Sequence, residues 1–209
     1  MDDDAGYAVA AWREEGRWSV AALPPRATES LDSFLAALRQ LIAEGGALGF
    51  LVVDEDFFLA VRMMPDGAAR LLLSDIGAAL EFPLAEEVAD MLEADLPEDD
   101  EELDEVEPVG DFTFAADMGM PVSELELILD DPELYPDEQV VAIAARVGLH
   151  VGRVGAAVRL GQAEAADDLA AGHARQVLLA LLFRAVGVDR VHAQRALHTD
   201  EAADAAVAA

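Results

Sequence analysis

Carboxylates are the reactive side chains that this chain offers in quantity. Its 209 residues hold 43 Asp and Glu against 13 Lys and Arg, which gives a formal net charge of −30. The densest run spans residues 96–108, Leu-Pro-Glu-Asp-Asp-Glu-Glu-Leu-Asp-Glu-Val-Glu-Pro. Such a tract can recruit a basic protein, mimic a nucleic acid, or act as a solvated linker that self-repulsion keeps extended. The sequence favours the linker.

Two further groups have the residue types of a metal site. Asp54-Glu55-Asp56 places three acids in a row, but the glycine and the terminal glutamate of an EF-hand loop are missing, so a turn between strands is favoured. The histidines lie at 150, 173, 192 and 198. His192 and His198 are six residues apart and do not share a helix face, which favours surface histidines. We predict no catalytic, cofactor-binding or metal-binding residues and no cofactor.

Missing residue types exclude several chemistries. Without cysteine the chain forms no disulfide, thiolate nucleophile or cysteine-ligated zinc site. Without lysine it has no P-loop. Zinc deaminases need His-x-Glu and Pro-Cys-x-x-Cys, whereas His192 is followed by Ala-Gln. We therefore predict that the protein is not an enzyme; an acid-based or metal-dependent enzyme would require several carboxylates converging in one pocket.

The charge is confined to one part of the chain. Residues 1–145 account for the whole charge of −30, and residues 146–209 are balanced. Phosphate binding depends on Lys and Arg, so we expect no direct contact with nucleic acid. A charge-steered partner would be a basic protein, although surface acids also serve solubility alone.

The sequence predicts a cytoplasmic protein. Met1-Asp2-Asp3-Asp4 is the opposite of the basic start of a signal peptide. The longest strongly apolar run, Val177 to Phe183, is too short to span a bilayer, so no membrane association is expected. The absence of Lys and Asn beside abundant Ala, Arg and Gly is typical of a GC-rich bacterial genome.

Residues 1–94 are predicted to form an α/β antiparallel-sheet domain. Apolar residues from Leu31 to Ile42 follow a 3.6-residue stripe, with Thr28 or Ser30 as the cap and Gly45-Gly46 at the end. Strands joined by tight turns, such as Pro65-Asp66-Gly67, favour antiparallel pairing. The all-apolar run 48–53 suits a strand covered on both faces. The expected strands are 7–12, 17–23, 48–53, 57–64 and 69–73, and a second helix spans 83–94.

The resulting fold class is α+β, a five-stranded antiparallel sheet in β-β-α-β-β-β order. This order is similar to the profilin-like and roadblock/longin-like sandwiches, which is an analogy of fold and says little about function. It supports an alternative function, a roadblock-like dimerising module in which edge strands or the first helix pair two copies.

The rest of the chain divides into three predicted segments. Residues 95–111 form an acidic linker, 112–148 a helical hairpin, and 149–209 an Ala/Arg-rich helical tail. In the hairpin, helices begin at Pro121 and Pro136, the latter followed by acids that suit a first turn. The aromatic and sulfur side chains before it are expected in the core rather than on a binding surface: Phe112, Phe114, Met118 and Met120.

Several short strings carry a family resemblance. They are the strand Tyr7-Ala8-Val9-Ala10-Ala11-Trp12, the acidic stretch ending in Gly110-Asp111, Leu134-Tyr135-Pro136-Asp137-Glu138, and Arg146-Val147-Gly148. Together they resemble the bacterial tRNA adenosine deaminase-associated protein family over about residues 5–148, and the tail is unmatched. The family's name implies association with the deaminase that makes inosine at the wobble position of tRNA. The resemblance brings no catalytic or binding residues with it.

From these observations we expect a non-catalytic accessory protein that binds a partner protein. The resemblance implies that the partner is a tRNA adenosine deaminase. The residues that bind the partner are not indicated by the sequence.

Overall fold

The computed structural model describes residues 6–41, 45–53, 55–97 and 106–149. All of them belong to a compact unit that comprises residues 1–169. A second unit, residues 170–209, lies outside the described residues. So do the predicted tail helices, the four histidines, Asp54 and the centre of the acidic tract, residues 98–105.

The core of the unit is one antiparallel sheet with the strand order β2-β1-β3-β4-β5-β6. The α+β class with an antiparallel sheet is confirmed, but the sheet has six strands, so the prediction of five is wrong. The strands are β1 Tyr7–Glu14, β2 Arg17–Ala22, β3 Ala47–Val53, β4 Phe57–Met63, β5 Ala69–Leu73 and β6 Val109–Gly110.

The strand that the sequence missed, β6, has only two residues. Val109 pairs with Leu73 and Gly110 with Leu72, next to a bond from the Asp111 N–H to the Leu71 carbonyl oxygen at 2.7 Å. Gly110 has a φ of +121°, and a Cβ there would lie 2.3 Å from the Leu71 oxygen, so glycine is required for this pairing. Two residues inside an acidic stretch show no alternation, which explains why the pattern gave no signal.

Tight turns connect the strands as predicted. Glu15 and Gly16 between β1 and β2 both have positive φ, +49° and +75°, the backbone signature of a type I′ hairpin turn. In the turn before β5, Gly67 has a φ of +87°, and Asp66 Oδ1 accepts the Ala68 N–H at 3.0 Å.

Helix α1 spans Leu31–Arg39, and its cap is Ser30, whose Oγ accepts the Ser33 N–H at 3.2 Å. The helix ends earlier than predicted. The N–H groups of Gln40 and Leu41 bond three residues back, at 3.2 and 3.0 Å, and this tightens the last turn before Gly45-Gly46 is reached.

The other predicted helices of the described region are present. They are α2 Pro83–Leu92, α3 Val122–Leu129 and α4 Pro136–Arg146, and the short 3-10 turns are η1 Pro25–Thr28, η2 Gly77–Leu80 and η4 Ala116–Met118. None of the described helices is long and apolar enough to cross a membrane.

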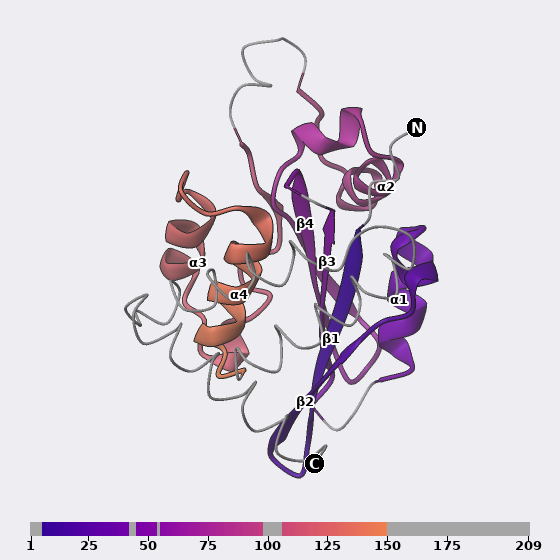
Figure 1. Ribbon diagram of the computed structural model, residues 1–209, viewed down its shortest axis with the longest axis vertical. Coiled ribbons are helices and arrows are strands. Elements are labelled where there is room, and N and C mark those ends of the chain that lie inside the picture. The colour runs from indigo at the N-terminus through magenta and orange to yellow at the C-terminus, as the bar shows by residue number, and fades with distance from the viewer. Residues whose placement is uncertain (1–5, 42–44, 54, 98–105, 150–209) are drawn as a thin grey trace, which may run out of the picture. The chain divides into compact units, whose positions relative to one another are not determined.

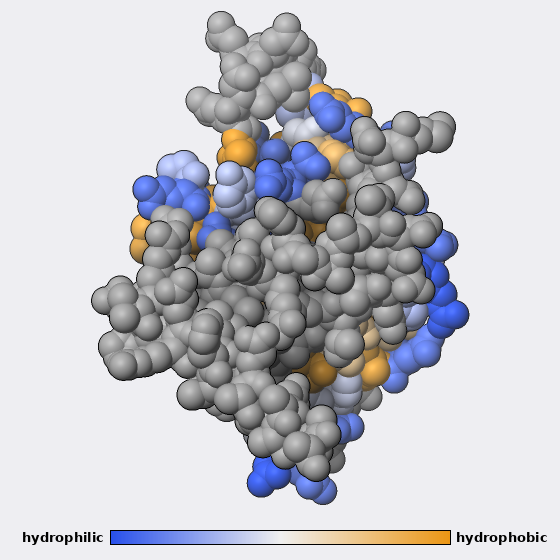
Figure 2. Space-filling model, in the orientation of Figure 1, coloured by the Kyte–Doolittle hydropathy of each residue, from blue (hydrophilic) through white to orange (hydrophobic). Residues whose placement is uncertain are grey.

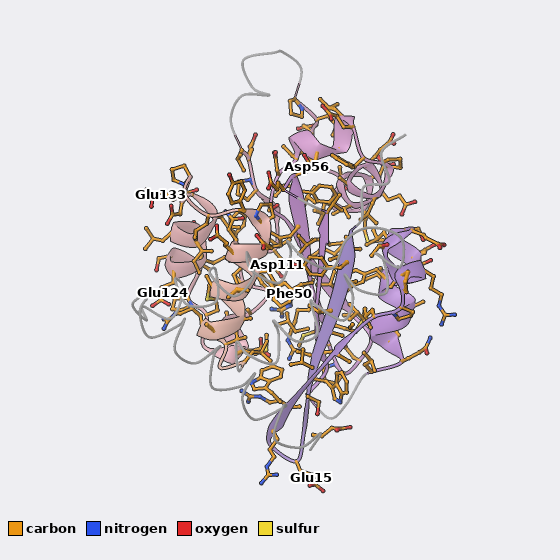
Figure 3. All side chains as sticks on the ribbon, in the orientation of Figure 1. Glu15, Phe50, Asp56, Asp111, Glu124 and Glu133 are labelled. Carbon is orange, nitrogen blue, oxygen red and sulfur yellow. The ribbon has the colours of Figure 1, made fainter. Side chains whose placement is uncertain are left out.

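Helices cover both faces of the sheet. Figure 1 shows α1 and α2 on one side of the strands and α3 and α4 on the other. Gly49 faces α1, where a Cβ would lie 2.6 Å from the Leu38 side chain, so the missing side chain lets the helix approach closely. Phe50 faces the opposite way and lies between the sheet and α4 (Figure 3). Every residue of β3 and β4 is buried, which confirms the prediction for the run 48–53.

Two arginines stand side by side on the α3–α4 face. Arg62 of β4 is paired directly with Arg70 of β5, and like charges in this position repel. Each is neutralised by an acid from the segment after β6. Arg62 Nη2 lies 3.0 Å from Asp117 Oδ2, and Arg70 Nε lies 3.7 Å from Asp111 Oδ2. We call Arg62 and Arg70 the arginine pair.

Arg62 is the more deeply bound of the two. It is 5% exposed and donates to three backbone carbonyl oxygens, those of Gly45 at 2.7 Å, Met63 at 3.1 Å and Ala47 at 3.3 Å. Its guanidinium therefore ties the loop before β3 to the end of β4 and, through Asp117, to η4.

Replacing Arg62 by Met should destabilise the fold by about 2–4 kcal/mol, because the buried carbonyl oxygens of Ala47 and Met63, and the less buried one of Gly45, lose a charged donor. Urea unfolding measures this as a lower midpoint with an unchanged m value. Arg70→Met is the matched control. It breaks a half-exposed pair and should cost under about 1 kcal/mol. Equal losses in the two variants would contradict the central role of Arg62.

Candidate functional site

Of the sequence candidates for a metal site, only Glu55 and Asp56 lie among the described residues. Glu55 and Asp56 lie in the β3–β4 turn, where the Asp56 N–H bonds to the Val53 carbonyl oxygen at 3.0 Å. No group of three acidic or histidine side chains among the described residues could hold a metal ion. Phe114 and Met120 are buried, as expected for core residues, and Phe112 and Met118 are half-buried.

A groove of 630 Å³ lies between the end of α2, the β5–η2 turn and β6. Its apolar lining comes from Ile76, Leu92, Ala94 and Val109. These residues are up to 33 positions apart in sequence, so no local pattern could have indicated that they share one cavity. We call this the α2–β6 groove.

Backbone hydrogen bonds fix one wall of the α2–β6 groove. The Ile76 N–H donates to the Glu107 carbonyl oxygen at 2.8 Å. Asp75 Oδ1 accepts the Gly77 N–H at 2.9 Å and the Glu107 N–H at 3.4 Å. The end of the acidic stretch is therefore held against the β5–η2 turn, and the segment from Glu107 to Asp111 forms a wall of the groove.

The end of α2 forms the facing wall. Glu93 adopts the left-handed conformation, with φ +53° and ψ +38°, at the position after a helix where glycine is usual. Its N–H bonds to the Asp90 oxygen at 3.2 Å, and the Ala94 N–H bonds to the Ala89 oxygen at 3.0 Å. This turn reverses the chain and brings Glu93 and Asp95 to the lining of the groove.

Four carboxylates line the α2–β6 groove, and three of them have no neutralising partner among the described residues. Asp111 forms an ion pair with Arg70. The other three, Glu93, Asp95 and Glu107, form no ion pair with any described residue. The carboxylates surround an apolar floor, and the lining contains no histidine, serine or basic side chain. The chemistry that this arrangement offers is the binding of cationic groups that carry apolar neighbours.

The excess of acid extends beyond the groove. The described residues from Glu55 to Leu149 carry 20 acidic side chains and three arginines. All three arginines are already in ion pairs, Arg62 and Arg70 as above and Arg146 with Glu124. Residues 6–41 hold four acids and four arginines. The negative charge of the described residues therefore belongs to the part of the unit that contains α2, β6, α3 and α4.

The start of α4 is a second concentration of titratable groups. Burial raises the pKa of the Asp137 carboxyl; the nearby charges of Glu138 and Glu55 raise it further, and the Glu138 N–H, which Asp137 Oδ1 accepts at 2.9 Å, lowers it. Burial, followed by the charge of Asp137, raises the pKa of the Tyr7 phenol well above its ordinary value. Tyr7 is 5% exposed and begins β1, so this corner joins α4 to the sheet.

The string from Leu134 to Glu138 builds this helix start. The Tyr135 N–H donates to Glu138 Oε2 at 2.9 Å, and Pro136 occupies the first helical position, where no N–H is needed. These residues, which contribute to the family resemblance, therefore form the start of α4.

The comparisons with known proteins agree with that resemblance. The family model described as Rv3753c-like tRNA adenosine deaminase-associated protein matches residues 6–150. The chain belongs to this family. Protein Rv3753c of Mycobacterium tuberculosis is 45% identical over 148 residues, which cover 70% of this chain and 84% of that protein. No solved structure matches the chain significantly.

The family match includes the whole α2–β6 groove and the α4 corner, and it ends where the described residues end, within one position. The family is named for association with the deaminase rather than for deamination. Sequence reasoning identified the family but none of the groove residues.

Glu93→Gly should stabilise the fold by about 0.5–1 kcal/mol, because glycine removes the steric cost of the left-handed conformation and loses part of that gain to its greater freedom when unfolded. Thermal unfolding would show a higher midpoint. Glu15→Gly is the matched control, with the same charge change at another positive φ, and should give a similar gain. A destabilised Glu93→Gly variant would show that the Glu93 side chain supports the helix end.

Asp137→Asn should be more stable than the natural protein at neutral pH. A carboxyl with a raised pKa in the folded chain stabilises the fold only while it is protonated, and this contribution is lost as the pH rises through the folded pKa. Asparagine keeps an oxygen for the Glu138 N–H and carries no charge. Urea unfolding at about pH 4 and about pH 7 should therefore show a gain that is larger at the higher pH.

The control for this prediction is Asp130→Asn, which neutralises an exposed carboxylate just after α3. It should change the free energy of unfolding by less than about 0.5 kcal/mol at either pH. A gain for Asp137→Asn that did not depend on pH would rule out titration of the Asp137 carboxyl as its cause.

Proposed function

We propose that this protein is a non-catalytic accessory protein and that its partner is a tRNA adenosine deaminase. The observation that carries the proposal is the family membership, since the family is named for association with that enzyme. The charge distribution of the described residues gives the proposal a physical basis.

A partner that binds tRNA must present Lys and Arg to the phosphates, because neutralising them drives nucleic-acid binding. The described residues from Glu55 onward present the opposite charge, with every arginine already paired. Such a surface repels tRNA and attracts a basic protein. It also repels a second copy of itself, which disfavours a homodimer through this part of the chain.

The acidic surface also includes exposed apolar side chains. Leu127 of α3 is 72% exposed and has Glu126 and Glu124 as close neighbours in the helix. Figure 2 shows hydrophilic and hydrophobic surface side by side over α3, at the left of the view. Interfaces combine exposed apolar anchors with a charged rim, and the charges act mainly on specificity and on the rate of association.

The test is the equilibrium binding of the purified protein to the purified tRNA adenosine deaminase of the same organism. We expect saturable binding whose Kd rises at least about tenfold between about 50 mM and about 500 mM salt, since exposed charges are screened. An unrelated acidic protein of similar net charge is the control for attraction by charge alone. Absence of binding at the lower salt concentration would refute the proposal.

A further inference from the structure

We propose that the α2–β6 groove is the docking site for an extended segment of the partner, in which basic side chains alternate with apolar ones. The inference deepens the proposed function and rests on it for the identity of the partner. It is carried by three features of the groove: its apolar floor, its carboxylates that no described residue neutralises, and the outward backbone groups of β6.

The floor and the rim of the groove are suited to apolar side chains. Ile76, at 3% exposure, forms part of the floor. The residues next to the two walls in sequence, Leu96 and Val106, are 39% and 67% exposed, and Met91 on α2 is 50% exposed. These three exposed apolar residues each lie next to a lining residue in sequence, and exposed apolar side chains near a concave site are typical of a surface that a partner covers.

The carboxylates specify the charge of the occupant. Glu93, Asp95 and Glu107 face the groove without an ion-pair partner among the described residues. An anionic or neutral peptide would leave them facing one another across an apolar floor. Arg or Lys side chains would give each a charge-assisted hydrogen bond, and arginine could also lie flat over the apolar floor.

The dimensions and the edge of the sheet indicate an extended segment rather than a folded domain. A volume of 630 Å³ is in the range of sites that hold a small molecule or a few side chains. Because the Asp111 N–H bonds to Leu71 and Gly110 lies opposite Leu72, the alternation of an antiparallel pair directs the N–H and C=O of Gly110 away from β5. A partner strand can therefore use both groups, as in β-strand addition.

One residue that lines the groove, Glu93, has a backbone conformation that costs stability. Of the described non-glycine residues, only Glu15 and Glu93 have positive φ. Glu15 lies at the tip of a hairpin, at the bottom of Figure 3 and away from Asp111, where the turn itself requires positive φ. The end of α2 requires positive φ in the same way, and glycine would relieve the strain at either position. What distinguishes Glu93 is that this residue lines the groove.

The experiment uses the full chain and three fluorescein-labelled peptides of equal length. One alternates Arg with Leu, one replaces each Leu by Gly, and one replaces each Arg by Gln. We expect saturable binding of the Arg-Leu peptide and at least about tenfold weaker binding of the other two, because each lacks one of the two required features. Equal affinity for the Arg-Gly peptide would overturn the role of the apolar floor.

Two variants locate the site. Glu93→Gly should weaken binding of the Arg-Leu peptide about fivefold, and adding Glu107→Gln should weaken it more than about tenfold. Glu15→Gly removes the same charge and the same kind of backbone strain at the hairpin tip and should leave the affinity unchanged. Thermal unfolding of Glu93→Gly, expected to show a higher midpoint than the natural protein, separates weaker binding from misfolding. Equal weakening by Glu93→Gly and Glu15→Gly would overturn the proposal in favour of attraction by net charge.

The deaminase itself separates this inference from the proposed function. If the natural protein binds the enzyme and the Glu93→Gly/Glu107→Gln variant binds it equally well, the groove is wrong and the accessory role stands. If the groove binds the Arg-Leu peptide as described and the natural protein does not bind the enzyme, the groove stands and the deaminase is not the partner.

Discussion

The fold depends on holding the acidic segment after β6 against the sheet. The arginine pair contributes to this through two ion pairs, of which the one made by Arg62 is the more buried. Arg62 and Arg70 are cross-strand neighbours that would repel each other, and they are neutralised by Asp117 and Asp111. Those two acids lie at the beginning of the segment that leads into α3 and α4. The helices of the second face therefore follow a segment held to the sheet by charge. Without the two arginines, Asp111 and Asp117 would have no ion-pair partner among the described residues of the sheet.

The same attachment explains where the remaining charge lies. In the described residues after Glu55 the three arginines are all in ion pairs, so each further acid adds to an unbalanced surface. Apolar side chains interrupt that surface in the α2–β6 groove and at Leu127, so a basic partner of the kind proposed would be selected by shape as well as by charge.

Sequence reasoning succeeded where the signal is local. A few neighbouring residues were enough to predict three elements: the helical stripe from Leu31 to Leu38, the Pro65-Asp66-Gly67 turn and the apolar run of β3. It failed where structure depends on distant partners. Val109 and Gly110 form a strand because they pair with the edge of β5. In the sequence Arg62 is only a charged residue within a predicted strand, and its role depends on the distant carbonyl oxygens of Gly45 and Ala47. The groove could not be predicted because its two walls come from segments separated by the acidic tract.

Acidic side chains that confer solubility and acidic side chains that bind a partner differ in where they must lie on the surface. Charge for solubility is useful anywhere on the surface and gives no reason to hold a residue in an unfavourable conformation. A binding carboxylate must stand at one place, even at a cost in backbone energy. Glycine would relieve the strain at both Glu15 and Glu93, but of the two only Glu93 lines the α2–β6 groove. The place of Glu93 beside an apolar lining is what distinguishes the groove from the general acidity of the described residues.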